Sequence, residues 1–230
     1  AVAQRLASTD DVWIMGSRPE TAHDAVYRLR EAGVSVIGAT GVDAADEDAV
    51  NNAVDTAVAA MGGLDGVFIN AGMDGQAVPA TELGVEGFRR LLDVNVVGPF
   101  IVAKAAIRHL SRPGTIVFNS SANAVRPEAH FLDYNASKAA VASMAATLAL
   151  ELSAEGVSVI SLAPGYFPTR MTEPLREDPE RLRWFSERTM LGRLGDPARD
   201  LAGPLLLLAS DASAYMTGQI LYVDGGWSAW

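Results

Sequence analysis

The chain has 230 residues, 49% of them hydrophobic and 20% charged, which is enough to bury the core of one large domain. Its net charge of −10, without a basic run, argues against nucleic acid as a partner. It has no cysteine, which excludes disulfides and thiolate catalysis, and no apolar run long enough to span a membrane. We therefore expect a cytoplasmic protein with no membrane partner and no metal.

The first half of the chain alternates between apolar runs and amphipathic segments. Residues 1–6 have a helical pattern with no cap before them, as in a helix entered partway. Short apolar runs predict strands at 12–15, 34–37 and 67–69. Amphipathic segments that end near glycine predict helices at 20–32 and 46–61.

The second half continues this alternation. A long helix is predicted over 85–110, interrupted at Gly98-Pro99, and an alanine-rich helix over 132–155. The charged segment 169–193 is predicted to be irregular, with a helix after it at 197–210. The remaining strands are predicted at 115–118, 157–162 and 220–223.

The predicted strands are continuous apolar runs, which is typical of a parallel sheet covered by helices on both faces. We therefore predict an α/β fold with a doubly wound, Rossmann-like sheet in a single domain over 1–230. Ligands of such sheets bind at the carboxyl ends of the strands. Asn70, Ser121 and Pro164 follow three different strands, so we expect them to converge on one rim.

A hydroxyl, a phenol and an ammonium group occur at a spacing that suits proton transfer. Tyr134 follows Ser121 by thirteen residues, and Lys138 follows Tyr134 by four. Residues four apart share a helix face, so the ammonium of Lys138 can lie beside the phenol. A neighbouring cation favours the phenolate, which would make Tyr134 a usable general acid or base near neutral pH.

These residues, with others in the same order, resemble the motifs of the short-chain dehydrogenase/reductase family. The matching positions are Asn70-Ala71-Gly72, Asn95, Ser121, Tyr134, Lys138, Pro164-Gly165 and Thr169. The resemblance implies hydride transfer between a nicotinamide and a small-molecule carbonyl or alcohol. Ser121 would bond the substrate oxygen, Tyr134 would move the proton, and Lys138 would lower the tyrosine pKa and bind the ribose. Asn95 would hold a water molecule that links Lys138 to bulk solvent. The alternative is that Asn95 only forms local hydrogen bonds within its helix.

The resemblance also implies the cofactor contacts. Asp43, with Val42 and Ala44 beside it, would meet the adenine amino group; the alternative is that Asp43 is a solvated loop carboxylate. The adenosine half would pack against Asn70, Ala71 and Gly72. The nicotinamide carboxamide would meet Pro164, Gly165, Phe167 and Thr169.

The turn after the strand at 12–15 predicts the choice of cofactor. An NAD enzyme usually has a carboxylate there for the ribose hydroxyls, whereas this chain has Ser17 and Arg18. A guanidinium and a hydroxyl suit a 2′-phosphate, so we predict NADP(H) rather than NAD(H). The alternative is that Arg18 stacks on adenine, a role open to it with either cofactor.

One motif of the family is missing from the chain. The glycine-rich turn and the strand before it would precede Ala1, and that strand is the central one of the sheet. Without it, the strands at 12–15 and 67–69 would each lose a ladder partner. We therefore expect roughly 15–25 further residues before Ala1 in the natural protein.

Substrate choice is expected in a lid at about 166–195, which resembles that of gluconate 5-dehydrogenases and their polyol or sugar-acid relatives. Arg126, His130 and Arg170 would meet an acidic or polyhydroxy substrate, and Tyr166 and Trp184 would wall the pocket. The alternative for these five residues is surface charge and core packing.

Other functions and the oligomeric state follow from composition. One alternative is a 3-oxoacyl-carrier-protein reductase, but such an enzyme would favour a basic patch for its carrier protein, and this chain is acidic. Another alternative is a non-catalytic member that binds a nucleotide and would not need the tyrosine. No Gly-x-Ser-x-Gly elbow surrounds Ser121, which argues against a hydrolase. The alanine-rich helix face over 139–149 permits close helix packing, so we expect a homodimer or homotetramer.

Overall fold

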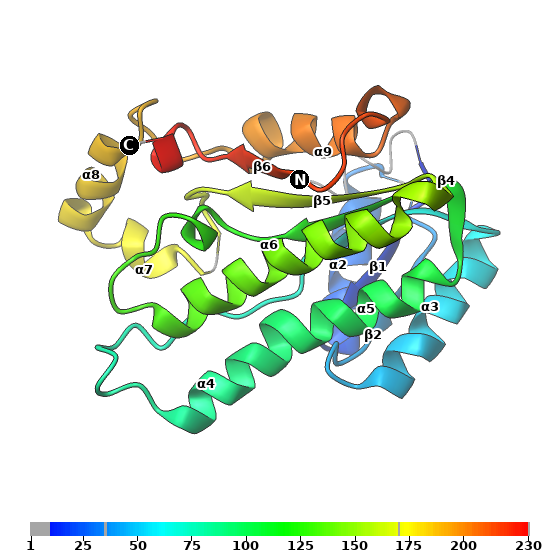
Figure 1. Ribbon diagram of the computed structural model, residues 1–230, viewed down its shortest axis with the longest axis horizontal. Coiled ribbons are helices and arrows are strands. Elements are labelled where there is room, and N and C mark those ends of the chain that lie inside the picture. The colour runs from blue at the N-terminus through cyan, green and yellow to red at the C-terminus, as the bar shows by residue number, and fades with distance from the viewer. Residues whose placement is uncertain (1–9, 35, 170, 230) are drawn as a thin grey trace.

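The computed structural model describes residues 10–34, 36–169 and 171–229, and it confirms a parallel α/β sheet with helices on both faces (Figure 1). The predicted helix over 1–6 and the predicted substrate residue Arg170 lie outside the described residues. The strands are β1 (Trp13–Gly16), β2 (Gly38–Gly41), β3 (Leu64–Ile69), β4 (Leu110–Asn119), β5 (Val157–Pro164) and β6 (Ile220–Val223).

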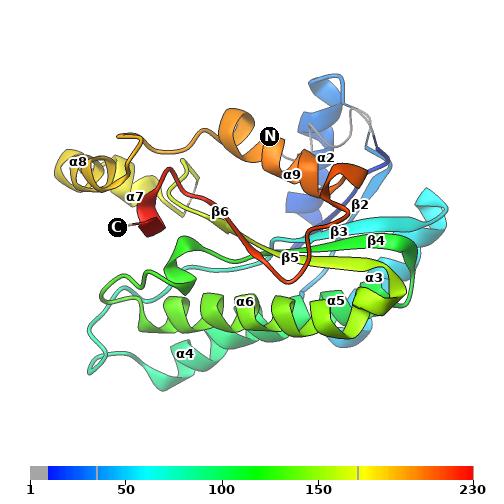
Figure 2. The ribbon, with the colours of Figure 1, turned by 45° about the horizontal axis from the view of Figure 1, so that its top comes forward.

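Helices on either face make the sheet doubly wound. Figure 2 shows α3, α5 and α6 on one face and α2 and α9 on the other. The α-helices are α2 (Pro19–Glu31), α3 (Glu47–Met61), α4 (Val85–Leu92), α5 (Gly98–Ile107), α6 (Leu132–Leu152), α7 (Glu173–Arg176), α8 (Pro179–Arg188) and α9 (Ala202–Leu208).

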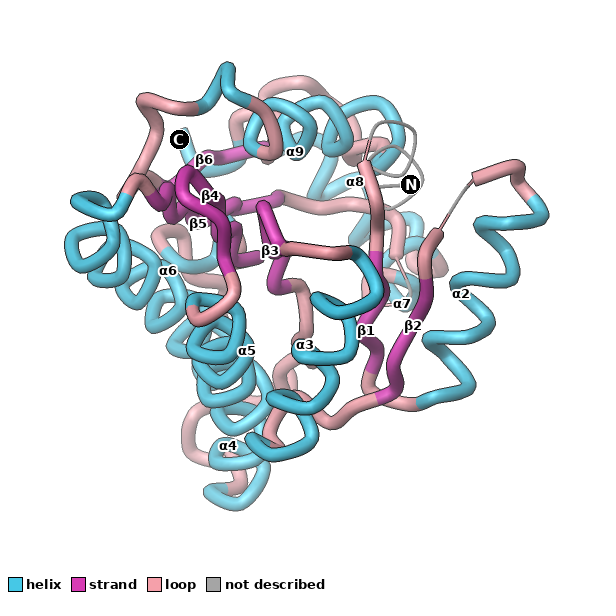
Figure 3. Tube along the Cα trace, turned by 90° about the vertical axis from the view of Figure 1, so that its right-hand side faces the viewer, coloured by secondary structure: helices cyan, strands magenta, loops and turns pink. Residues whose placement is uncertain are grey.

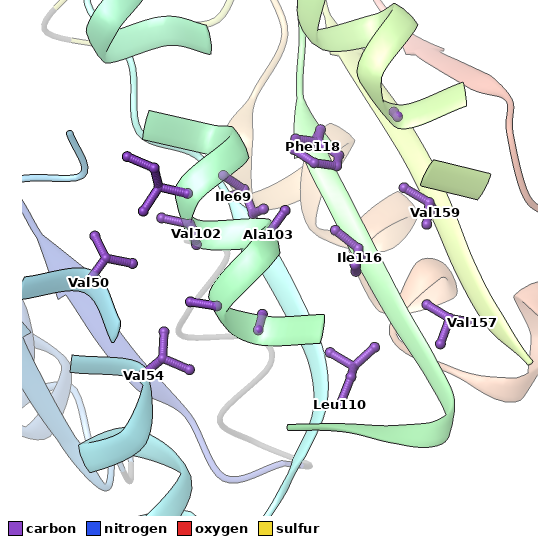
Figure 4. Close-up of a cluster of buried hydrophobic side chains, with 14 of the residues drawn as sticks. Val50, Val54, Ile69, Val102, Ala103, Leu110, Ile116, Phe118, Val157 and Val159 are labelled. Atoms are coloured by element: carbon purple, nitrogen blue, oxygen red, sulfur yellow. The ribbon is translucent and has the colours of Figure 1, made fainter. Parts of the chain in front are cut away.

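The core lies on both faces of β4 and β5, which is why these strands are continuous apolar runs. Ile116 and Phe118 of β4, both 0% exposed, pack toward α3, α5 and α6 (Figure 4). Val117, between them in the sequence, belongs to a second cluster with Leu205 and Leu208 of α9. Successive residues of a strand point to opposite faces, so one strand serves both clusters.

The strands form two sheets within the described part of the chain. One has the order β3-β4-β5-β6, and the other pairs β1 with β2; all pairs are parallel. Figure 3 shows the β1–β2 pair beside α2, apart from β3. The edges of β1 and β3 that have no described partner are the two edges that the predicted central strand would join. A segment before Ala1 stays a prediction.

The second strand lies later than predicted, at Gly38–Gly41 rather than 34–37. Close backbone approach explains why a strand forms from residues of low strand propensity. A Cβ atom on Gly38 would lie 2.4 Å from the ring of Trp13, and one on Gly41 would lie 2.1 Å from the backbone of Pro19. Glycine is therefore required at both positions by β1 and α2.

The long helix predicted over 85–110 is interrupted at a different place. Its break is a π-helical turn at Asp93–Val97 between α4 and α5, and Gly98-Pro99 begins α5. The helix ends at Ile107 and Leu110 already belongs to β4. A single extra residue in a helix is the usual form of such a turn, often at a functional position.

The segment predicted to be irregular contains the helices α7 and α8. Asp178 caps α8, because its carboxylate accepts hydrogen bonds from the amides of Glu180 and Arg181, and Pro179 occupies the first helical position. This start signal is present in the sequence and would have predicted the helix. No helix in the described part of the chain combines the length and apolarity needed to cross a membrane.

Candidate active site

Polar residues gather where the parallel strands end. Asn70 follows β3, and its side-chain oxygen accepts a hydrogen bond of 2.8 Å from the side-chain Nδ2 of Asn119, the last residue of β4. Ser121 follows β4, while the neighbouring Ser120 is 2% exposed and donates to the carbonyl of Lys138. The carboxyl ends of β3 and β4 are thus joined to each other and to α6.

Ser121, Tyr134 and Lys138 lie together on this rim. The Ser121 hydroxyl lies close enough to the phenol of Tyr134 to act on its pKa, which it lowers. Nζ of Lys138 lies 5.5 Å from the centre of the Tyr134 ring and donates to the carbonyl of Asn119 at 2.8 Å. Lys138 is 4% exposed, so its ammonium is held by the protein rather than by water.

The electrostatics of Tyr134 differ from the expectation of a pKa lowered by Lys138. Burial raises the pKa of Tyr134 to about 12, against the lowering effect of the Ser121 hydrogen bond, and the charges of Asp74 and Glu128 add to the rise. Burial also lowers the pKa of Lys138 to about 8. Lys138 therefore loses its charge at a lower pH than a solvent-exposed lysine does, because desolvation disfavours the charged form.

Asn95 lies in the π-helical turn and is 1% exposed. Its side-chain oxygen accepts from the amide of Met73 at 2.7 Å, and its Nδ2 donates to the Met73 carbonyl at 3.0 Å and to Ser137 Oγ at 3.1 Å. These partners are distant in sequence, so the alternative of a locally bonded asparagine is wrong. Asn95 fixes the loop after β3 against α6.

A buried carboxylate missed in the sequence fixes the same loop. Asp133 is 0% exposed and accepts hydrogen bonds from the amides of Gln76 and Tyr134. Its sequence position, directly before Tyr134 in the first turn of α6, was the available signal, because acids are favoured there. A Cβ atom on Gly75 would lie 2.6 Å from Asp133 Oδ1 and 3.1 Å from Tyr134 Cβ, so the loop backbone packs tightly here.

Several predicted cofactor residues lie at the ends of β1 and β2. Ser17 and Arg18 are exposed, directly after β1. Val42 is 9% exposed, and its amide donates to the carbonyl of Gly16, which brings the two strand ends together. Asp43 is exposed, and its Oδ1 accepts from the amide of Ala45 at 3.0 Å, a local turn that leaves one carboxylate oxygen for another donor.

The other predicted cofactor residues follow the remaining strands. Ala44 packs against Gly98, and Ala71 and Gly72 are exposed after β3. Pro164 ends β5, and Gly165 is so close to Asp224 that a Cβ there would lie 2.7 Å from its Cα.

Phe167 and Thr169, the last two predicted carboxamide contacts, are tied to Thr172. Phe167 is 6% exposed and packs against Gly195, and its carbonyl accepts from the Thr172 hydroxyl at 2.6 Å. Thr169 is exposed, and its amide donates to the same hydroxyl.

The predicted substrate residues are not all brought together. Arg126 is exposed and donates to the carbonyl of Ser228 at 3.4 Å, and His130 is exposed with a left-handed backbone φ of 70°. The hydroxyl of Tyr166 donates at 2.5 Å to Oε2 of Glu128 in the loop before α6, and its contact with substrate stays a prediction. Glu128 was not predicted from the sequence. The only available sign was its position as an acidic residue between Ser121 and Tyr134.

Trp184 belongs to an aromatic cluster formed by Tyr166, Trp184, Phe185 and Trp227. The ring centres of Tyr166 and Phe185 are 4.0 Å apart, and those of Trp184 and Trp227 are 5.8 Å apart. The cluster joins α8 to the C-terminal turn and leaves Trp184 41% exposed, so its place in the wall of the substrate pocket stays a prediction.

A cavity of about 390 Å³ lies next to this cluster, between the lid and the turn after β6. Its walls include Tyr166, Phe167, Arg193 and Asp224, but not Ser121 or Tyr134. It therefore adjoins the rim rather than containing the reacting groups. The described residues include no group of three or more His, Asp or Glu side chains arranged to hold a metal ion.

The chain is similar to known oxidoreductases over nearly its whole length. The family described as enoyl-(acyl carrier protein) reductase matches residues 1–228. The glucose 1-dehydrogenase of Gluconobacter oxydans is 36% identical over 234 residues, covering 98% of this chain and 86% of that protein. The cis-4-hydroxycyclohexanecarboxylate dehydrogenase of Sinomonas cyclohexanicum is 35% identical over 231 residues, 100% of this chain and 91% of that protein.

A solved structure agrees with this similarity. The gluconate 5-dehydrogenase of Burkholderia cenocepacia, in complex with NADP and tartrate, superposes with a TM-score of 0.93 at 30% sequence identity. The superposition covers 100% of this chain and 90% of that one. Gluconate 5-dehydrogenase is also the type of enzyme that the lid sequence resembles.

Proposed function

The chain belongs to the short-chain dehydrogenase/reductase family, and on that premise we propose that it transfers a hydride between NADP(H) and a carbonyl or secondary alcohol. The single observation that supports this most is the Ser121–Tyr134–Lys138 group at the carboxyl rim of the sheet, in which Ser121 acts on the pKa of the phenol and the ammonium of Lys138 is buried beside the ring. A solvated Tyr/Lys pair on a helix surface would have neither feature.

The residues of the site fit a nicotinamide nucleotide. A Cβ atom on Gly72 would lie 3.4 Å from Asn95 Oδ1 and 3.6 Å from Lys138 Nζ. Because glycine has no Cβ, the space next to these two polar groups is left free for a ligand. Lys138 would hold the ribose there, and Ser17 and Arg18, exposed after β1, would hold the 2′-phosphate. The cofactor supplies the hydride when bound.

The chain's own residues handle the proton and the developing charge. Ser121 donates to the substrate oxygen and stabilises its charge as the carbonyl is reduced. Tyr134, whose pKa of about 12 lies far above neutral pH, carries its proton and donates it to that oxygen. Lys138, charged below about pH 8, favours the phenolate that remains.

Replacing the tyrosine tests this function. Tyr134→Phe keeps the ring packing and removes the proton donor, so carbonyl reduction should fall about 10²- to 10⁴-fold while NADPH affinity is kept. Tyr27→Phe is the matched control, because Tyr27 is exposed and bonds only Glu31 in α2. A Tyr134→Phe protein with unchanged turnover, or a wild type that binds NADPH without oxidising it on any carbonyl, supports the non-catalytic alternative.

The cofactor and the substrate class are tested by rates. Initial rates with NADPH should exceed those with NADH, and Arg18→Ala should narrow the difference; a clear preference for NADH contradicts the proposal. A panel of ketones, sugar acids and acyl thioesters separates the proposed sugar-acid or polyol substrates from the 3-oxoacyl-carrier-protein alternative.

A further inference from the structure

Asp133 is a fully buried carboxylate next to Tyr134 that the proposed chemistry does not use. It is 0% exposed, in the first turn of α6. Among the described residues, no lysine, arginine or histidine forms an ion pair with it, and its hydrogen bonds come from neutral N–H groups. Burying a carboxylate without a cation is costly, so Asp133 depends on these N–H groups.

The carboxylate connects two segments that are distant in the sequence. Its Oδ2 accepts from the backbone amide of Gln76 at 3.1 Å and from Nε2 of the same residue at 3.4 Å. Its Oδ1 accepts from the backbone amide of Tyr134 at 2.8 Å. One side chain therefore connects the end of the loop at 73–76 to the residue that carries the phenol.

The beginning of this loop is connected to Tyr134 by a second route. Asn95 bonds the amide and the carbonyl of Met73, and its Nδ2 also donates to Ser137 Oγ at 3.1 Å. The Ser137 hydroxyl in turn donates to the carbonyl of Tyr134 at 2.7 Å. Asp133 and Asn95 thus connect opposite ends of the loop to the amide and the carbonyl of Tyr134.

Between these two attachments, the loop backbone packs directly on Tyr134. A Cβ atom on Gly75 would lie 2.6 Å from Asp133 Oδ1 and 3.1 Å from Tyr134 Cβ, so the loop leaves no room between itself and α6. Tyr134 therefore cannot move toward the loop unless the loop moves. A proton donor acts within hydrogen-bond reach of its acceptor, and a misplacement of about 1 Å can cost about 10²-fold in rate.

We propose that Asp133 is a positioning residue: its carboxylate holds the loop at 73–76 against Tyr134 and thereby fixes the phenol for proton transfer. Its effect on rate rests on the proposed function, whereas its hold on the loop does not. The alternative is a carboxylate that only stabilises the start of α6, where acids are favoured. Such a residue changes how many molecules are folded, whereas a positioning residue changes the turnover of each folded molecule.

Asp133→Asn tests the effect on rate. The amide has the shape of the carboxylate but only one acceptor oxygen, so either Gln76 or Tyr134 loses its partner. The substrate is the panel carbonyl that the wild type reduces fastest, and rates are expressed per NADPH-binding site counted by calorimetry. We expect kcat to fall about 10- to 100-fold, with KM for NADPH changed by less than about twofold. The solvent deuterium isotope effect on kcat should increase, because proton transfer becomes more strongly rate-limiting.

Gly75→Ala disturbs the same contact from the loop side and leaves the carboxylate of Asp133 in place. It should give the same pattern, a lower kcat with little change in KM for NADPH. Glu155→Gln is the matched control. Glu155 directly follows the other end of α6, and its carboxylate also bonds a distant segment, through Arg112. This variant should leave kcat and KM unchanged.

Hydrogen exchange followed by mass spectrometry tests the hold on the loop without turnover. In Asp133→Asn, the amides at 73–76 and in the first turn of α6 should exchange about fivefold faster or more than in the wild type. The amides of β4 and β5 should keep their wild-type protection, because the main core does not open. Glu155→Gln should not change the exchange of either segment.

The outcomes separate the two proposals. Unchanged exchange at 73–76 in Asp133→Asn, or an unchanged kcat per NADPH-binding site, overturns the positioning role. If Asp133→Asn does not fold, Gly75→Ala decides by the same kinetic measurements. Absence of NADPH oxidation with every carbonyl of the panel overturns the proposed function, while the exchange result still decides whether Asp133 holds the loop against Tyr134.

Discussion

Lys138 combines deep burial with a charge that the proposed chemistry uses. Its Nζ donates to the Asn119 carbonyl, and its pKa lies at about 8 because water is excluded. The ammonium is fully charged well below this pH and is lost as the pH rises through it. Tyr134, with a pKa of about 12, keeps its proton over the same range.

The pH dependence of cofactor use should therefore report the lysine. We expect kcat/KM for NADPH, which reflects the free enzyme, to be constant below about pH 8 and to decline above it. Lys138→Arg, which stays charged, should move the decline to higher pH at a lower overall rate. A wild-type profile that is flat to pH 10 would contradict the assignment.

Asn95 is the residue whose loss should destabilise the site most directly. Asn95→Ala leaves the amide and carbonyl of Met73 and the hydroxyl of Ser137 without their partner in a buried setting. We expect the free energy of unfolding in urea to fall by about 2–4 kcal/mol.

The control for this prediction is Asn52→Ala, on the exposed side of α3. It should change the free energy of unfolding by less than about 0.5 kcal/mol. A loss below about 1 kcal/mol for Asn95→Ala would show that the loop after β3 holds its place without this side chain.

At the residue scale, the sequence predicted which groups meet but not their charge states. The spacing of Ser121, Tyr134 and Lys138 was sufficient to bring them together, because helix periodicity and strand ends fix their positions. The pKa values of Tyr134 and Lys138 depend on burial, and that of Tyr134 depends also on Asp74 and Glu128, which come from loops whose path no periodicity encodes. The same reason hid Glu128 and the exposed position of His130.

The β2 element shows how packing can override propensity. The apolar run at 34–37 predicted a strand, yet the ladder with β1 forms at Gly38–Gly41. The need for glycine here comes from residues of other elements. Trp13 leaves no room for a side chain at Gly38, and Pro19 leaves none at Gly41. A single-segment pattern has no access to such contacts.

Alanine at one of these glycines should therefore be costly. Gly41→Ala would place Cβ 2.1–2.5 Å from atoms of Pro19, in backbone and ring, so we expect about 2–3 kcal/mol of destabilisation. Gly63→Ala, with nothing within 4 Å of its Cβ, should be near neutral. Equal midpoints in urea for the two variants would show that α2 moves away from β2 at little cost.

The lid is the element where a neglected start signal would have improved the prediction. Asp178 followed by Pro179 is a cap and a first-turn proline, and α8 begins there. Its charged sequence, Pro179–Arg188, buries Phe185 against Tyr166 and Trp227. The predicted boundaries of the lid at 166–195 remain a prediction.

At the scale of the molecule, the two sheets should differ in stability. β4 and β5 each have partners on both sides and supply residues such as Ile116 and Val159 that are 0% exposed. β1 and β2 pair with each other within the described chain, and all residues of β1 are half-buried. Local opening is easier where fewer apolar contacts are lost.

Hydrogen exchange followed by mass spectrometry checks this difference. Amides of β1 and β2 should exchange at least tenfold faster than those of β4 and β5 at the same pH, since their opening does not require the main core to open. Uniform protection over all strands would mean that both sheets open as one cooperative unit.

The aromatic cluster has a consequence for how binding can be observed. Tyr166 bonds Glu128 through its hydroxyl and contacts the ring of Trp227, which in turn contacts Trp184. A molecule that displaces the Tyr166 hydroxyl from Glu128 changes the surroundings of those two rings. Trp13, hydrogen-bonded to Thr40 beside the other sheet, lies outside this cluster. Intrinsic tryptophan fluorescence should therefore report substrate binding without an added dye.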